Sequence, residues 1–270
     1  MARGTMGIIG CPVLEDEIVY ALESDPDEKR IYLVESAPAR TLAAKLDRRG
    51  IAYEPVGEWE FGKGYAPQGM GDGFNVVVMM NKLGLHSRPA FLKETIEEQL
   101  RFHHGRFGSI ALYYGMCGNA GWDVSEWASR ELGARVSVFR GEDGSVCDDC
   151  IGVAVGSHPR YCEFVKKHPG MFYVTPCIAG NWKEYSEELD FCKGFEIMGI
   201  NTVKEVFQVY GYKKAVKIDT GLGVKGEELD RGCRLFSEET GLEMTEAEPG
   251  SVMRYPADRI YAEAKAALGG

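Results

Sequence analysis

A series of short apolar runs, each about one strand in length, restricts the folds open to this chain of 270 residues. Residues 75–80 (Asn-Val-Val-Val-Met-Met) and 109–114 (Ser-Ile-Ala-Leu-Tyr-Tyr) are apolar almost throughout, which is typical of parallel strands buried on both faces. Similar runs occur at residues 7–10, 30–34, 136–139, 171–176 and 215–219. Because segments with helical spacing separate these runs, we predict an α/β protein, Rossmann-like, with a mainly parallel sheet or sheets.

The helical segments are expected at residues 14–22, 38–49, 91–103, 159–167, 184–198, 202–210, 229–241 and 256–268. Between residues 50 and 73, Gly, aromatic and acidic residues show no sustained period, so we expect a long irregular excursion there. Residues 151–156 form another short apolar run. We expect residues 1–270 to make a single α/β protein. It could divide near residues 133–136 into two similar halves, with the strand ends of each half facing a shared cleft.

Composition excludes several classes of partner. The formal net charge is −10, whereas nucleic acids and anionic membranes require clustered Lys and Arg. We find neither the long apolar segment of a signal peptide at the start nor a later segment of membrane-spanning length. We therefore expect a cytoplasmic protein whose 8 cysteines are mostly reduced, with oligomerisation left open.

Cysteines follow several of the predicted strands. Cys11, Cys117, Cys150 and Cys177 lie at or just beyond strand ends, whereas others lie in predicted helices. Because the carboxyl ends of parallel strands meet at one edge of a sheet, we expect the sulfurs of Cys11, Cys117 and Cys150 to lie close together. The alternative is that each thiol is a small buried hydrophobe.

Clustered thiolates are ligands for zinc, copper(I) or iron–sulfur clusters. Cys147 and Cys150 form a Cys-x-x-Cys pair, but no second pair accompanies them, which weakens a zinc-finger interpretation. A redox dithiol is the other alternative, and the intervening Asp148 and Asp149 disfavour its thiolate.

Other residues near these strand ends are candidates for the same site. Gly115 and Gly118 lie close to Cys117 and would let the backbone approach a cofactor, with Asn119 beside them. His86 follows the strand at 75–80 and could be a nitrogen ligand or a proton donor. We interpret the pair Gly221 and Gly223 as a turn, too short to be a dinucleotide fingerprint.

Several motifs occur in an order that resembles a known family. They are Cys11-Pro-Val-Leu-Glu-Asp-Glu17, Leu85-His-Ser-Arg-Pro89, Tyr114-Gly-Met-Cys-Gly-Asn119, Asp149-Cys-Ile151 and Pro169-Gly-Met-Phe-Tyr-Val-Thr175 with Trp182. Together they resemble the uncharacterised proteins catalogued as domain of unknown function 1638, whose members look like proteins of anaerobic bacteria and methanogens. Genes of that family often lie beside corrinoid-dependent methyltransferases.

The resemblance implies that Cys11, His86, Cys117, Asp149 and Cys150 belong to one shared site, with His86 and Asp149 in catalytic roles. The family has a glycine before the tryptophan of the last motif, where this chain has Asn181. That departure leaves open whether Cys177 or His86 supplies a fourth ligand.

We therefore expect a metal- or iron–sulfur-cluster-binding protein that serves corrinoid-dependent methyl transfer or one-carbon metabolism. Cys11, Cys117 and Cys150 would bind an iron–sulfur cluster or, as the alternative, zinc, and leave an open coordination position. If the protein is an enzyme, the reaction would be methyl transfer or redox activation at that metal. The alternative function is a non-enzymatic accessory protein that binds a small metabolite or a corrinoid protein.

Overall fold

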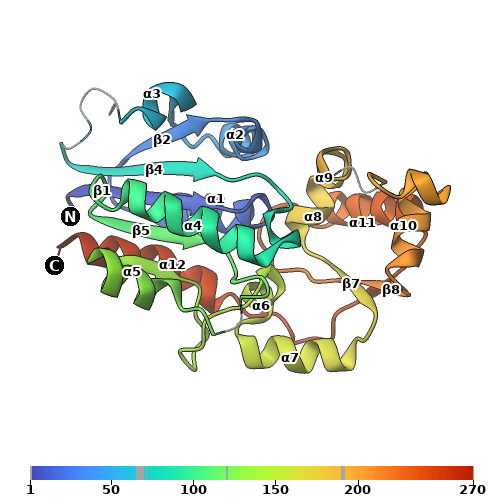
Figure 1. The fold of residues 1–270 in the computed structure, drawn as a ribbon. Helices are drawn as coiled ribbons and strands as arrows, with labels where there is room; N and C mark the ends of the chain where they lie inside the picture. Colours follow the sequence, from blue (N-terminus) through green and yellow to red (C-terminus); the bar gives the residue numbers. More distant parts are fainter. Residues whose placement is uncertain (1, 65–69, 71, 120, 190–191, 270) are drawn as a thin grey trace.

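The computed structural model of the chain describes residues 2–64, 70, 72–119, 121–189 and 192–269. It contains a six-stranded sheet in the order β3-β2-β4-β1-β5-β6 and a three-stranded sheet in the order β7-β8-β9 (Figure 1). All pairs of neighbouring strands in both sheets are parallel. The prediction of a Rossmann-like α/β fold is therefore confirmed.

The strands are β1 (Gly4–Gly10), β2 (Arg30–Glu35), β3 (Glu54–Gly57), β4 (Phe74–Met80), β5 (Ser109–Tyr113), β6 (Val136–Val138), β7 (Met171–Val174), β8 (Lys214–Lys217) and β9 (Glu243–Glu246). The helices are α1 (Glu15–Ser24), α2 (Arg40–Arg49), α3 (Glu58–Gly62), α4 (Pro89–His103), α5 (Val124–Leu132), α6 (Cys150–Val155), α7 (His158–Lys167), α8 (Pro176–Gly180), α9 (Trp182–Leu189), α10 (Val203–Val209), α11 (Glu227–Thr240) and α12 (Tyr255–Ala266).

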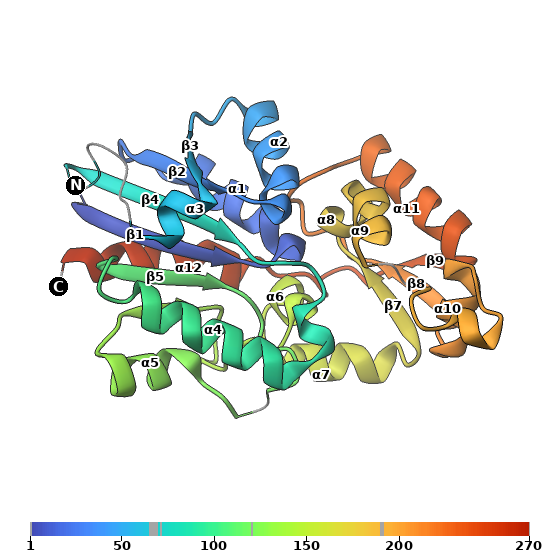
Figure 2. The ribbon, with the colours of Figure 1, turned by 45° about the horizontal axis from the view of Figure 1, so that its top comes forward.

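Helices cover both faces of the larger sheet, which explains its apolar strands (Figure 2). Every residue of β4 is buried, and successive residues alternate between two cores. Val76 and Val78 pack with side chains of α1, α2 and α12, whereas Val77 and Met79 pack with side chains of α3, α4 and α5. The alternation follows from the two-residue period of a strand.

The smaller sheet is also covered on both faces. Phe172 of β7 and Ala215 of β8 pack with α8, α10 and α11, and their neighbours Tyr173 and Val216 pack with α6 and α7. The chain then returns to the larger sheet, because Ile260 and its neighbours on α12 belong to the core formed with α1 and α2. The first and last parts of the sequence therefore complete one core together.

Several predicted boundaries differ from those observed. The segment expected to be an irregular excursion contains β3 and α3, and the rest of it includes residues 65–69, which lie outside the described residues. Only Val56 of β3 is buried, so the strand has no visible alternation. Residues 184–198 do not form one helix, because Gly194 has a φ of +86° and the final turn, Glu196–Met198, is a 3-10 helix.

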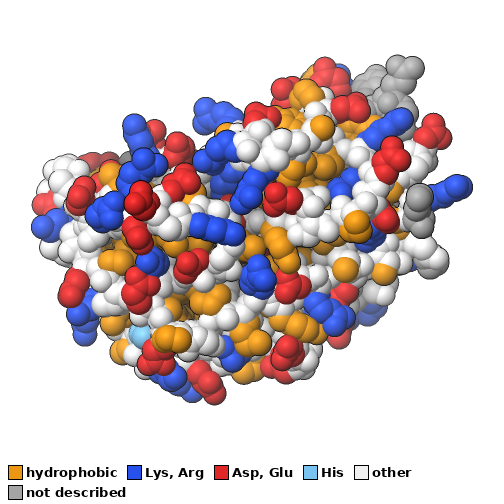
Figure 3. Space-filling view, turned by 180° about the vertical axis from the view of Figure 1, so that it is seen from behind, with side chains coloured by type: hydrophobic (Ala, Val, Ile, Leu, Met, Phe, Trp, Pro, Cys, Tyr) orange, Lys and Arg blue, Asp and Glu red, His pale blue; other side chains and the backbone are white. Residues whose placement is uncertain are grey.

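The proposed division near residues 133–136 falls just before β6, which pairs with β5 in the larger sheet. The second sheet begins at Met171. Within the described part of the chain, no helix has the length and apolar character needed to cross a membrane. One face of the molecule carries acidic and basic side chains interspersed rather than gathered into separate patches (Figure 3).

Candidate functional site

A cavity of about 560 Å³ lies between the carboxyl edge of the larger sheet and the edge strand of the smaller one. Loops after the adjacent strands β1, β4 and β5 form one wall, together with the start of α6. Strand β7, α7, α9 and the segment before β8 form the other. The connection after β1 leads to one face of the sheet and that after β4 to the other, an arrangement that opens a crevice at the strand ends.

The three thiols predicted to share a site all line this cavity. Burial raises the pKa of Cys150 well above its usual value, and the charges of Asp149, Cys117 and Cys11 raise it further. Burial likewise raises the pKa of Cys11 to about 12, with Glu15 and Glu17 adding to the effect. The thiols are therefore close enough to disfavour one another's ionisation, and near neutral pH they are protonated.

The donor set is soft, as the sequence predicts for zinc or an iron–sulfur cluster. Among the described residues, however, no group of three or more His, Cys, Asp or Glu side chains is arranged to hold a metal ion. The thiols lie on one wall of the cavity, but their sulfur atoms are not already arranged as the ligands of a metal ion. Their convergence is observed, and the metal itself stays a prediction.

The loop after β5 is held in a strained conformation around Cys117. Its φ is +46°, and it is the one non-glycine residue of the described chain with a positive φ. Such a conformation costs roughly 1–2 kcal/mol for a residue with a side chain. The amide of Cys117 donates to the carbonyl of Asp148, and a Cβ added to Gly115 would lie 2.3 Å from the Cα of Asp149. Gly115 therefore allows the two loops to touch, and this contact brings Cys117 towards Cys150.

Gly118 and Asn119 have different surroundings. Gly118 lines the cavity with a φ of +86°. The amide Nδ2 of Asn119 donates to the carbonyls of Pro89 (2.9 Å) and Met116 (3.0 Å). Asn119 thus fixes the loop to the start of α4, a role that its side chain performs without a cofactor.

Asp149 and His86 both line the cavity. Asp149 caps α6, accepting hydrogen bonds from the amides of Ile151 and Gly152 at 2.8 Å each, and it also contacts the hydroxyl of Tyr161. Burial nevertheless raises its pKa. His86 lies on the rim with an exposed side chain; the protein around the ring lowers its pKa, and the charge of Asp149 acts in the opposite direction. The two groups are within electrostatic reach of each other.

Comparison with known families gives one result. The family described as "Protein of unknown function (DUF1638)" matches residues 80–253, which is more than half of the chain. The chain belongs to this family. The match includes His86, Cys117, Asp149 and Cys150, whereas Cys11 precedes it. No curated protein and no solved structure gives a significant match.

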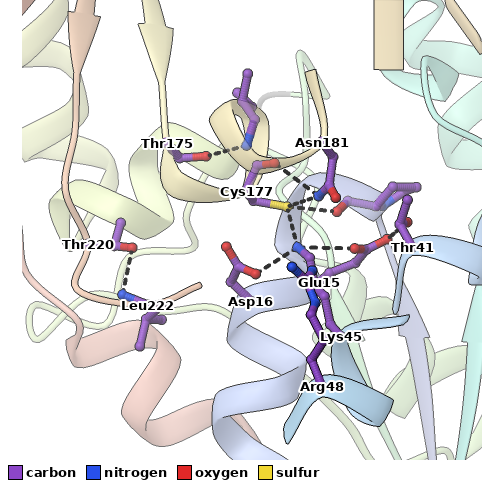
Figure 4. Close-up of polar contacts among 12 residues, drawn as sticks. Glu15, Asp16, Thr41, Lys45, Arg48, Thr175, Cys177, Asn181, Thr220 and Leu222 are labelled. Carbon is purple, nitrogen blue, oxygen red and sulfur yellow. Dashed lines mark hydrogen bonds and ion pairs between the residues drawn. The ribbon is translucent and has the colours of Figure 1, made fainter. Parts of the chain in front are cut away.

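The remaining candidate cysteines of this family member lie outside the cavity lining. Cys147 is fully buried in the core that α1, α2 and α12 cover, so the Cys-x-x-Cys pair is divided between a core and the cavity. Cys177 is buried behind the cavity, where its sulfur lies 3.4 Å from Nζ of Lys45 and 3.2 Å from the carbonyl oxygen of Pro12 (Figure 4).

Sequence reasoning missed a buried ionic cluster beside Cys177. Nζ of Lys45 lies 2.7 Å from Oδ1 of Asp16 and 3.2 Å from Oε2 of Glu15, and all three side chains are buried. Glu17 is also buried, and burial together with the charge of Asp16 raises its pKa to about 8. The sequence feature that could have indicated this cluster is the run Glu15-Asp16-Glu17. Acidic residues are common in the first turn of an exposed helix, so the run did not predict buried carboxylates.

A third glycine follows the pair Gly221 and Gly223 and was not used in the prediction. Residues 221–226 read Gly-Leu-Gly-Val-Lys-Gly and connect β8 to α11, which is the context of a dinucleotide-binding loop. In the structure, a Cβ added to Gly223 would lie 1.9 Å from Oδ2 of Asp16. The close approach that this glycine permits is therefore to the side chain of Asp16. We assign the loop to packing between α1 and the second sheet.

Proposed function

We propose that this protein holds a soft metal centre, an iron–sulfur cluster or zinc, through Cys11, Cys117 and Cys150, and binds an organic ligand beside it. The observation that carries the proposal is the convergence of three thiols, from the loops after β1 and β5 and from the start of α6, on one cavity. Thiols that raise one another's pKa ionise together only when a cation offsets their charge.

The size of the cavity supports a ligand in addition to a metal. Small-molecule sites usually occupy about 300–1,000 Å³, and this cavity measures about 560 Å³. A centre bound to three thiols at one wall leaves the opposite wall free. A thiolate-bound metal with an open position supplies Lewis-acid or redox chemistry.

Two residues of the chain would handle protons at such a ligand. The imidazole of His86 reaches the rim, and the carboxyl of Asp149 lies deeper in the lining. Burial raises the pKa of Asp149, which moves it towards the range where proton exchange is efficient. The lowered pKa of His86 keeps its imidazole neutral near neutral pH, the form that can accept a proton. Methyl transfer or redox activation in corrinoid-dependent or one-carbon metabolism is the reaction class that we propose, on the strength of the family resemblance.

A non-enzymatic accessory protein is the second candidate. The capping hydrogen bonds of Asp149 give that carboxylate a structural role that requires no chemistry. In this case the cavity would bind a small metabolite or part of a corrinoid protein.

The test is metal content per chain after anaerobic purification, with an absorption spectrum to identify a cluster. Cys150→Ser replaces a soft ligand by a hydroxyl and is expected to lose most of the metal while circular dichroism stays unchanged. Cys162→Ser is the matched control, because Cys162 lies on α7 outside the cavity lining, with its sulfur 3.5 Å from Nε2 of His158. Equal metal in both variants, or none in the parent protein grown with iron and zinc, would contradict the metal centre and favour the accessory function.

A further inference from the structure

We infer that the organic ligand of this cavity is a cation whose charge is covered by alkyl groups, such as a quaternary ammonium. The inference rests on the proposed use of the cavity as a ligand site and adds the class of ligand. It follows from the wall that lies opposite the thiols and from the charges of the lining.

The wall opposite the thiols is mainly aromatic. Seven aromatic side chains line the cavity. One of them, Tyr114, follows β5 of the larger sheet, and the smaller-sheet side supplies the other six: Tyr161, Phe172, Tyr173, Trp182, Tyr185 and Tyr212. The rings of Phe172 and Tyr212 meet edge to face, with centroids 5.3 Å apart. Several aromatic rings around one space form the kind of cage that attracts a cation through the negative faces of the rings.

The charges of the lining have one sign. Asp148 and Asp149 both line the cavity, and the described lining contains no Lys or Arg. His86 is the one lining group that could become positive, and it lies at the rim. An anion would meet two carboxylates with no compensating charge, whereas a cation would be attracted.

The hydrogen bonds of the aromatic residues indicate which kind of cation fits. The hydroxyl of Tyr185 donates to the carbonyl of Pro12 (2.6 Å), that of Tyr173 to the carbonyl of His168 (3.2 Å), and Nε1 of Trp182 to Glu239 (2.7 Å). The hydroxyl of Tyr161 contacts Asp149. These four polar groups are already engaged within the protein, so this wall offers mainly ring surface. A primary ammonium needs several acceptors at once to replace its water, whereas a methylated ammonium carries little water to lose and suits a wall of rings.

The experiment uses two probes of nearly the same shape. Choline carries a trimethylammonium group, and 3,3-dimethyl-1-butanol has carbon in place of the nitrogen and no charge. Isothermal titration calorimetry of the full chain is expected to show choline binding at least about tenfold more tightly than the neutral alcohol. Equal affinity for the two probes, or binding of neither, would overturn the inference.

Variants locate the binding. Tyr212→Leu removes a ring and Asp148→Asn removes a charge, and each is expected to weaken choline binding several-fold, whereas Tyr212→Phe keeps the ring and should retain it. Trp59→Leu is the aromatic control, because Trp59 is 71% exposed on α3, away from the lining. Choline affinity that is unchanged in Tyr212→Leu and Asp148→Asn would place binding elsewhere and refute the inference.

Metal content separates this inference from the proposed function. Tyr212→Leu and Asp148→Asn are expected to retain the metal of the parent protein, since neither residue supplies a thiol. Choline binding by metal-free Cys150→Ser would support the aromatic site even where the metal centre fails. Metal that depends on Cys150, combined with equal affinity for the two probes, would leave the metal centre standing and refute only the cation.

Discussion

At the scale of single residues, the charges beneath the cavity are unevenly matched. Glu15, Asp16 and Glu17 lie together in the first turn of α1, and Lys45 is the cation that reaches Glu15 and Asp16. Burial acts to lower the pKa of Lys45, but the charges of Cys177, Asp16 and Glu15 outweigh it, and the pKa is raised. The ammonium of Lys45 therefore forms ion pairs with two carboxylates, those of Glu15 and Asp16. Among the described residues Glu17 has no such ion pair, and its raised pKa keeps it mostly protonated near neutral pH.

The neutral Glu17 should make stability depend on pH. Its pKa rises from 4.5 when unfolded to about 8 when folded, so the folded state binds the extra proton between these values. The associated stability is present in full below about pH 4.5 and is lost as the pH rises through about 8, at no more than about 1.4 kcal/mol per pH unit. Glu17→Gln, which cannot ionise, is expected to gain stability relative to the parent as the pH rises from about 5 to about 8.

Urea unfolding of both proteins across that range measures this difference. Glu23→Gln serves as the control, because Glu23 forms an ion pair with Arg49 in which both side chains are more than 40% exposed. Its unfolding free energy should run parallel to that of the parent. Parallel curves for Glu17→Gln as well would show that Glu17 ionises in the folded protein as it does in the unfolded one.

The residues of the cavity were predictable to different degrees. Cys11, Cys117 and Cys150 could be placed together because strand ends of a parallel sheet meet at one edge, a rule that needs no side-chain detail. The burial of Glu17 could not be predicted, because it depends on how α1 packs against α8 and α12, which are distant from it in the sequence. The division of Cys147 from Cys150 likewise depends on where α6 begins.

At the scale of elements, α6 connects the two walls of the cavity. Its first residue is Cys150, its cap is Asp149, and Ile151 and Ala154 pack against the smaller sheet. The apolar run 151–156 reads equally well as a strand or a helix, since a short run has no period that separates the two. The capping Asp149 and Gly156, which has a φ of +102°, mark the ends of the helix.

The two roles of Asp149 can be separated by substitution. Asp149→Ala removes the acceptor for two amides and is expected to lower the free energy of unfolding by about 1 kcal/mol. Asp149→Asn keeps an oxygen acceptor and should be nearly as stable as the parent in urea unfolding. A loss of stability in Asp149→Asn equal to that in Asp149→Ala would mean that the charge, and not the cap, stabilises this helix start.

At the scale of the whole molecule, the chain makes two units that cannot be separated by one cut. The smaller sheet lies between β6 and α12 in sequence, and α12 returns to pack on β5, β6 and α1. Tyr261 of α12 donates to Asp25 at 2.9 Å, and Lys265 lies 2.8 Å from Asp27. The alternation of strands and helices predicted the class of fold. The packing of α12 on the larger sheet could not be predicted, because the amphipathic pattern of a helix shows which face is buried but not which sheet buries it.

The return of α12 predicts that the two units unfold together. Ile260 is 1% exposed in the core of the larger sheet, and the neighbouring Arg259 faces solvent. Ile260→Ala is expected to lower the free energy of unfolding by about 2–5 kcal/mol, whereas Arg259→Ala should change it by no more than about 1 kcal/mol. Because Lys45 of α2 and Cys177 of α8 join the units through buried contacts, hydrogen exchange of the slowest amides should accelerate in β8 as well as in β5. Acceleration confined to β5 would show that the smaller sheet unfolds on its own.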